Sequence, residues 1–293
     1  EFAALGYSVD AKVLTASDYG VPQYRQRVIF LGTKGKQQNI TYPEPIGVSI
    51  SLRDAFADLP TVSPVTGTHD NSRLTPLTNI GHGHKGQFIR WVRKQANPLG
   101  QKILQRNCTL HKTRPVNPRD QAIFPLLRSG EKSQRILYRD IYPNRLDEIE
   151  KLLPEGYYLK RYKTVEPKVQ GPAWGQRRTK IWKWYDSEKF GDKMRRMRGD
   201  KPGPTVVAHL AKDGYMFIHP DENRTITVRE AARMQSFPDS YDFSAGGKNS
   251  TSQQFRQVGN AVPPLMALAI GCQIMLAMNR KPDMNLGSVF TLT

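Results

Sequence analysis

The stretch Asp18–Gly32, DYGVPQYRQRVIFLG, joins a polar turn to an uninterrupted apolar run. The run Val28–Gly32 is short, rich in β-branched and aromatic residues and closed by glycine, which predicts a buried strand. Upstream, Ser8–Thr15 alternates polar and apolar side chains as a strand does. Glu1–Leu5 can end a helix, with Gly6 as its C-cap. The first sixty residues therefore predict alternating α/β structure.

Start and stop signals mark two short helices. Ser51 is a favourable N-cap for a helix that stops before Pro60. Thr227 and Glu230 have the spacing of a capping box, which opens a helix running through Gln235. Both helices are short enough to need tertiary packing for their stability.

A longer helix is predicted at the C-terminal end of the chain. The apolar run Ala261–Met278 contains Pro263, Pro264 and Gln273 and is at the short limit for crossing a bilayer. Proline is favoured in the first turn of a helix. The run therefore predicts a buried helix of a soluble fold, with no membrane span.

The middle of the chain has weaker periodicity, from about residue 61 to residue 204. Two amphipathic helices are plausible there, near Gln87–Gln95 and Arg145–Leu153. After this stretch, Thr205–Val207 and Tyr215–Ile218 are expected to pair as a hairpin. Asp213 and the glycine after it form a favoured turn pair for that hairpin.

Positive charge is concentrated in this middle region. The chain carries a formal net charge of +18, and Thr61–Glu222 contains 31 Lys/Arg against 16 Asp/Glu. Such a field attracts a polyanion, because contacts with phosphates release condensed counterions. A solvated, solubilising surface is the alternative interpretation. Aromatic residues among the cations of Arg161–Lys201 favour a nucleic-acid surface.

Only Cys108 and Cys272 are present, which excludes a disulfide scaffold and a Cys-rich zinc site. The histidines lack thiol or carboxylate partners at ligand spacing, so no metal site is predicted. No basic and apolar leader opens the sequence, and two cysteines fit a reducing compartment. We therefore expect a cytoplasmic protein.

Three blocks carry a resemblance to the DNA cytosine-5 methyltransferases. Asp18–Val28 is similar to the family's Gln-x-Arg-x-Arg block, Arg224–Tyr241 to the block after the recognition domain, and Gln257–Pro264, QVGNAVPP, to the final block. They occur in family order around a long variable stretch. The resemblance implies an α/β fold: a partial Rossmann-like methyltransferase domain with an inserted, irregular target recognition domain. Its segments would be 1–60, 61–222 and 223–293.

The resemblance implies transfer of a methyl group from S-adenosylmethionine to carbon 5 of cytosine in double-stranded DNA. The target base must be flipped out of the duplex to be reached. Arg25 and Arg27 would hold the flipped ring and favour the charge that develops on it, with Arg27 the closer contact. Asn260, Ala261 and Val262 would contact the cofactor.

Further DNA contacts are predicted from the same resemblance and from charge. Gln23 would shape the arginine loop beside the DNA. Thr205 and Val206 resemble the pair that closes the recognition domain near the target base. In the basic middle region, the candidate phosphate contacts are Arg177, Arg178 and Lys180.

The catalytic cysteine of the family is absent from the sequence, which has no Pro-Cys dipeptide. The Glu-Asn-Val block and the Gly-rich cofactor loop are missing too. Cys108 and Cys272 lie in unsuitable contexts, so this chain alone is expected to be inactive. It could be a piece of an ordinary enzyme, a subunit of a split enzyme that needs a second chain carrying Pro-Cys, or a non-catalytic sequence-specific DNA-binding protein. A tRNA-directed relative is disfavoured by the long recognition stretch.

Overall fold

The computed structural model describes most of the two ends of the chain and parts of its middle. The described residues are 1–35, 40–63, 74–76, 79–96, 102–104, 106–116, 121, 124–130, 194–212 and 214–290. The predicted helix Arg145–Leu153 and the candidate contacts Arg177, Arg178 and Lys180 lie outside them.

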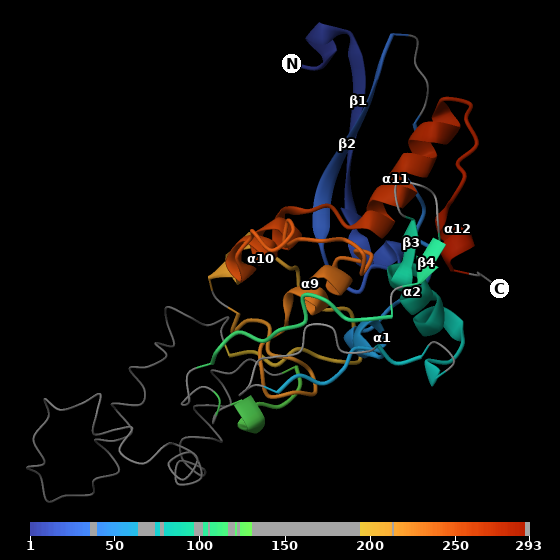
Figure 1. The fold of residues 1–293 in the computed structure, drawn as a ribbon. Coiled ribbons are helices and arrows are strands. Elements are labelled where there is room, and N and C mark those ends of the chain that lie inside the picture. The colour runs from blue at the N-terminus through green and yellow to red at the C-terminus, as the bar shows by residue number, and fades with distance from the viewer. Residues whose placement is uncertain are drawn as a thin grey trace, which may run out of the picture.

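The N-terminal segment forms a long antiparallel hairpin, which extends away from the body of the molecule (Figure 1). Its strands are β1 (Tyr7–Thr15) and β2 (Gln26–Lys34), joined through the 3-10 helix η2 (Ala16–Tyr19). A 3-10 turn, η1 (Ala3–Leu5), precedes β1 and ends at Gly6 in the left-handed conformation. Both predicted strands are therefore confirmed.

The burial predicted for Val28–Gly32 is wrong. Residues paired across the two strands share a face of the hairpin, and only one face packs inward. That face carries Leu14 and Leu31, both buried, and half-buried Ile29. The hydroxyl of Tyr42 donates to the carbonyl of Ile29 at 2.9 Å and covers this side. The other face is exposed, because no described element lies on it.

Helices form most of the remaining regular structure. They are α1 (Leu52–Phe56), α2 (Gly83–Arg93), α9 (Val228–Met234), α10 (Thr251–Asn260), α11 (Pro264–Ala277) and α12 (Leu286–Val289). Shorter elements are β3 (Lys94–Ala96) paired with β4 (Lys102–Leu104), and the 3-10 helices η4 (Phe124–Leu126) and η6 (Ala208–Ala211). The sheets are thus two antiparallel pairs among the described residues, and no Rossmann-type parallel sheet is seen in them.

The capping signals read from the sequence place their helices correctly. Ser51 caps α1 in a capping box with Asp54, and Thr227 caps α9 in a capping box with Glu230. In each case the side-chain oxygen of the cap accepts from the third backbone N–H, and the carboxylate accepts from the cap's own N–H. Helix α2 confirms the amphipathic helix predicted near Gln87–Gln95.

The hairpin predicted for Thr205–Val207 and Tyr215–Ile218 is wrong. The backbone of Val206 is already engaged by side chains of the arginine loop: its N–H donates to Gln23 Oε1 at 2.6 Å, and its carbonyl accepts from Arg25 Nη1 at 2.7 Å. No strand partner is then needed. The described backbone from residue 217 to 219 pairs instead with 224 to 226.

The predicted C-terminal helix is present but is not fully buried. Helix α11 buries Leu265, Met266, Ala269 and Cys272, whereas Leu276 is 54% exposed. The segment Thr251–Ala277 is long and apolar enough to span a membrane by length and composition, a test that core helices of soluble proteins also pass. Sequence reasoning missed α10, whose N-cap is Ser250 in a capping box with Gln253.

One hydrophobic core joins the described segments. Its buried members come from all three predicted segments, with examples in Leu14, Phe88 and Phe255. The C-terminal helix α11 packs beside the N-terminal region: it contacts η2, and Thr41 Oγ1 donates to Gln273 Oε1 at 3.0 Å. The division into domains at residues 60 and 222 stays a prediction.

Candidate active site

Arg25 connects the arginine loop to two distant segments. The side chain is 4% exposed, and its Nη1 donates to the carbonyl of Val206 at 2.7 Å. Its Nη2 donates to the carbonyls of Gly259 and Ala261 at 3.2 and 3.3 Å. Burial, and secondarily the charge of Arg27, lowers the pKa of Arg25 to about 10. One guanidinium therefore holds the first and the last of the three family-like blocks, together with the segment around Val206, at one place.

Gln23 serves the same junction. It is fully buried, and its Nε2 donates to the carbonyl of Met234 at 3.1 Å while its Oε1 accepts from Val206 N. Both ends of the carboxamide are thus bonded to backbone. In this arrangement Gln23 fastens the loop to two distant backbone segments, and its side chain does not face solvent for direct contact with DNA.

Arg27 lies two residues farther along the loop and behaves differently. Its side chain is exposed, and the hydrogen bond found for it runs from Nη1 to the carbonyl of the preceding residue, Gln26, at 2.6 Å. On the hairpin it is paired with Leu14 at the base of β1 and β2. Of the two arginines, Arg27 has the guanidinium that faces solvent.

The turn after α10 lies against the arginine loop. Asn260 and Val262 are exposed, the latter by 58%, and Ala261 is half-buried. Arg25 binds the carbonyls on both sides of Asn260. A Cβ on Gly259 would lie 2.4 Å from the backbone of residues 207 and 208, so glycine allows α10 to approach η6 closely.

Thr205 and Val206 differ in the exposure of their side chains. Val206 is fully buried, so its side chain packs in the core and does not reach DNA in this structure. Thr205 is half-buried, and its hydroxyl donates to the carbonyl of Tyr24 at 2.6 Å. The pair therefore lies beside the arginine loop, and its place near a target base stays a prediction.

Buried charges fasten α9 to its surroundings. Arg233 is fully buried; it donates to Asp58 and, at 2.6 and 2.9 Å, to Asp239. These carboxylates raise the pKa of Arg233 well above its ordinary value against the opposing effect of burial. Arg229 donates to the carbonyl of Thr109 at 3.0 Å. The charged side chains of α9 thus brace the helix against other segments of the chain.

Glu230 belongs to a second buried group of charges. His219, Glu222 and Glu230 are close enough together to hold a metal ion. Arg224 already fills the cationic role, since its guanidinium donates to both carboxylates at 2.6 to 3.0 Å. His219 Nδ1 accepts from the backbone N–H of Asp221 and of Glu222, which places the proton on Nε2. The group is a structural ion network.

Comparison with known proteins identifies the same family that the three blocks resemble. The sequence profile of the C-5 cytosine-specific DNA methylase family matches residues 1–276. The chain belongs to this family. It is 32% identical to the Type II methyltransferase M.AgeI of Thalassovita gelatinovora, an alignment that covers 94% of this chain and 68% of that protein. It is 30% identical to the Type II methyltransferase M.DdeI of Desulfomicrobium norvegicum over 94% of this chain and 56% of that protein.

A solved structure supports a methyltransferase fold for the chain. It is an E. coli prophage-encoded protein described as a DNA modification methyltransferase, with a TM-score of 0.55 and 19% identity. The match covers 94% of this chain and 62% of that one. This methyltransferase chain therefore spans about three fifths of the length of several proteins that it resembles.

S-adenosylmethionine is the cofactor of C-5 DNA methyltransferases, and the turn after α10 fits one edge of a site for it. Asn260 presents an exposed carboxamide and Val262 an exposed apolar side chain, next to a backbone held by Arg25. A carboxamide can bond polar groups of such a molecule, and an apolar side chain can cover its adenine ring. Both exposed side chains therefore suit the role predicted for them.

The chain has two cysteines, Cys108 and Cys272. Both are buried, and burial raises the pKa of Cys108 to about 12. Burial also raises the pKa of Cys272, whose thiol donates to the carbonyl of Met284 at 3.1 Å. A buried thiol with a raised pKa is a poor nucleophile, because the thiolate is the reactive form.

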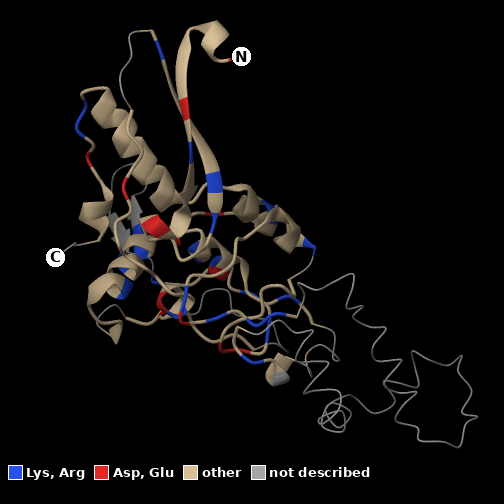
Figure 2. Ribbon diagram, turned by 180° about the vertical axis from the view of Figure 1, so that it is seen from behind, with Lys and Arg blue, Asp and Glu red and all other residues tan. Residues whose placement is uncertain are grey.

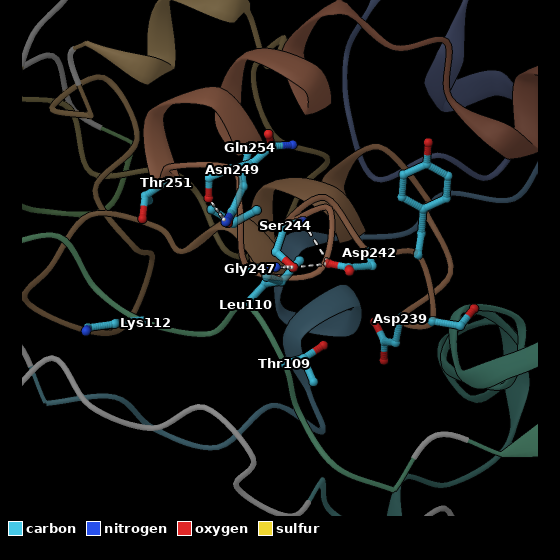
Figure 3. A pocket seen from close by; sticks show the side chains of 13 residues that line it. Thr109, Leu110, Lys112, Asp239, Asp242, Ser244, Gly247, Asn249, Thr251 and Gln254 are labelled. Atoms are coloured by element: carbon cyan, nitrogen blue, oxygen red, sulfur yellow. Dashed lines mark hydrogen bonds between the residues drawn. The ribbon is translucent and has the colours of Figure 1, made fainter.

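A cavity that sequence reasoning did not find opens beside α9 and α10 (Figure 3). It has a volume of about 590 Å³, and Thr109, Leu110 and Lys112 line it opposite the loop 239–249 and the start of α10. Asp242 accepts from the hydroxyl and N–H of Ser244 and from Gly246 N, which orders the loop. Arg27 and Asn260 do not line this cavity. No sequence signal marked it, because its walls come from distant segments.

Proposed function

We propose that this chain is the part of a DNA (cytosine-5-)-methyltransferase that recognises DNA, orients the target base and completes one edge of the cofactor site. The observation that carries the proposal is the Arg25 junction, in which one guanidinium joins the arginine loop, Val206 and the Asn260 turn. Residues far apart in the sequence are thereby brought to one place. The Type II names of the relatives suggest a restriction–modification setting.

In the proposed methyl transfer, Arg25 and Arg27 have different roles. Carbon 5 of cytosine becomes nucleophilic only after a thiolate adds to carbon 6, so charge develops on the ring. Arg27 is the group that would hold the flipped base and stabilise this charge, because its guanidinium faces solvent. Arg25 fixes the position of the loop that carries Arg27 relative to the turn that carries Asn260. When bound, S-adenosylmethionine supplies the methyl group.

The nucleophile has to come from a segment other than those described. Cys108 and Cys272 are both buried, and no Pro-Cys dipeptide occurs in the sequence. We therefore infer that activity requires a complementary methyltransferase segment that carries this dipeptide. The segment would belong to the same polypeptide in an ordinary enzyme and to a second chain in a split enzyme.

The test measures methyl transfer to duplex DNA. The chain alone is expected to transfer no methyl group. Co-expression with the part of M.AgeI that has no counterpart here is expected to restore transfer, and Arg27→Ala is expected to reduce it at least about 100-fold. Activity of the chain alone, or unchanged activity of the Arg27→Ala complex, would refute the proposal.

A non-catalytic DNA-binding subunit is the second candidate, favoured by the burial of both thiols. It predicts tight, site-specific binding by this chain alone, with no effect of added S-adenosylmethionine. The enzymatic assignment predicts instead that the cofactor changes the affinity of the assembled complex for its site. Binding measured with and without the cofactor, for the chain and for the complex, separates the two.

A further inference from the structure

Tyr24 is an exposed aromatic residue in the middle of the arginine loop. Its side chain is 51% exposed, whereas Gln23 and Arg25 on either side of it are 0% and 4% exposed. The ring of Tyr24 is thus directed away from the core that holds both neighbours. The N–H of Tyr24 donates to the carbonyl of Gly203 at 2.8 Å, and its carbonyl accepts from the hydroxyl of Thr205 at 2.6 Å. A backbone that is fixed at both ends therefore presents an aromatic ring to solvent.

A small cleft with a volume of about 270 Å³ opens beside Tyr24. Ser17, Asp18 and Ser49 contribute polar groups to its lining, and Pro202 contributes an apolar ring. The volume lies just below that of pockets that enclose whole drug-sized ligands, so the cleft suits a single ring system. The carboxylate of Asp18 disfavours a phosphate inside the cleft and can accept from the amino group of a base. The cleft therefore fits the edge of a base better than it fits the DNA backbone.

Basic side chains lie next to this cleft. Lys201 directly precedes Pro202, and its side chain is exposed. Arg198 is exposed as well, but its guanidinium already donates to Asp200 at 2.6 and 3.0 Å. Figure 2 shows that the Lys and Arg of the described residues are scattered over the body of the molecule. A polyanion is attracted to such a body, and a phosphate at the rim of the cleft can pair with Lys201.

We propose that Tyr24 is a positioning residue for methyl transfer, whose ring packs against the nucleotide next to the flipped cytosine. This rests on the proposed function, in which Arg27 holds the flipped base. The edge of the neighbouring base enters the cleft beside Asp18, and the phosphate of that nucleotide pairs with Lys201. Tyr24 thereby fixes the DNA strand on one side of the target.

The length of the loop brings Tyr24 within reach of this nucleotide. Tyr24 and Arg27 are three residues apart, so their Cα atoms are at most about 11 Å apart. Successive nucleotides of one strand are about 3.4 Å apart in a stacked duplex. Flipping removes a stacking partner from each neighbour of the target base, and an aromatic side chain can replace it. The flipped state therefore offers the ring a contact that the intact duplex does not.

The test uses the chain co-expressed with the part of M.AgeI that has no counterpart here, and a duplex site selected from a random pool by binding to this complex. 2-Aminopurine is placed in turn on each side of every cytosine in the site, because stacking quenches its fluorescence. Tyr24→Ala is expected to raise the fluorescence of the bound duplex at least about threefold and to lower kcat at least about tenfold, with little change in KM. Tyr24→Phe keeps the ring and is expected to behave like the wild type.

Tyr241→Ala is the matched control. Tyr241 is also 51% exposed, but it lines the separate cavity beside α9 and α10. Its replacement is expected to leave the fluorescence and kcat unchanged. Lys201→Ala is expected to weaken binding to all sequences alike and to reduce the slope of log Kd against log salt by about one.

Three results would overturn the role of Tyr24. The first is equal fluorescence of Tyr24→Ala and the wild type at every position, and the second is a Tyr24→Phe variant as impaired as Tyr24→Ala. The third is a lost urea-unfolding transition in Tyr24→Ala, which would assign the effect to folding. Methyl transfer is read separately: a site that is bound but not methylated refutes the proposed function, while the fluorescence still decides the role of Tyr24. A complex that selects no duplex site refutes both.

Discussion

Arg25 and Arg27 occupy similar places in the sequence, two residues apart in the same block. In the folded chain they differ because Arg25 points into the core and finds backbone carbonyls, whereas Arg27 remains in solvent. A guanidinium buried among carbonyl acceptors is a positioning group. A guanidinium in solvent beside the same loop is available for a ligand.

Alanine at each position should separate these roles. Arg25→Ala leaves buried carbonyls without a donor and is expected to lower the free energy of unfolding by about 2–4 kcal/mol. Arg27→Ala removes an exposed side chain and is expected to change it by less than about 0.5 kcal/mol. Urea unfolding measures both values. Equal destabilisation by the two variants would contradict the assignment.

Cys108 provides a second prediction for a single residue. Because burial raises the pKa of its thiol to about 12, little thiolate exists near pH 8. We expect iodoacetamide to label Cys108 at least about 100-fold more slowly in the native chain than in urea. Peptide mass analysis over time measures the rates. Rapid native labelling would mean that the thiol is accessible and would reopen its candidacy as the nucleophile.

At the scale of elements, α9 is the helix that organises the described body. It has seven residues, too few for stability on its own, and all seven are buried. The capping box sets its start, and Arg233 ties it to the end of α1 through Asp58 and to the following loop through Asp239. The helix is thus held by charges as well as by apolar packing.

Removing the charge of Arg233 should show how much its buried ion pairs matter for the free energy of unfolding. Arg233→Met leaves the buried carboxylates of Asp58 and Asp239 without their main partner, and we expect a loss of about 3–5 kcal/mol in the free energy of unfolding. The matched control is Arg53→Met, which breaks a surface pair with Asp221 at 2.7 Å and is expected to cost less than about 1 kcal/mol. Thermal or urea unfolding compares them. A smaller loss for Arg233→Met than for the control would show that the buried network is dispensable.

At the scale of the whole molecule, two buried histidines predict a dependence of stability on pH. Burial is the largest cause that lowers the pKa of His111 and of His219, and the nearby Arg224 lowers it further. The unfolded chain then binds more protons than the folded chain just below the ordinary histidine pKa of 6.5. Stability is present above that pH and is lost as the pH falls through this window.

We therefore expect the free energy of unfolding to decrease between pH 7.5 and pH 5.5. Urea unfolding at several pH values measures the slope. Replacement of both histidines, His111→Gln with His219→Gln, is expected to flatten it, while His84→Gln, at an exposed position, leaves it unchanged. A stability that rises on acidification would contradict the inferred neutral state of the buried rings.

Local signals predicted local structure well. The N-cap at Ser51 and the capping box at Thr227 placed α1 and α9, and the proline at the start of the last apolar run placed α11. The predictions that depended on neighbours were less reliable. The strand over Val28–Gly32 was assigned correctly but its burial was not, because an apolar run carries no information about what covers it.

The three family-like blocks and their order determined the family from the sequence alone, since each is a local pattern of residue types. Only the tertiary structure decided which of these neighbouring residues are structural and which are exposed. Arg25 and Gln23 hold the junction, whereas Arg27 and Asn260 face outward. The backbone of Val206 bonds to the arginine loop instead of to a strand. The physical reason is that a buried polar group needs a hydrogen-bond partner, and the fold decides which group that is. The carbonyls that accept from Arg25 lie about 180 to 240 residues away along the chain.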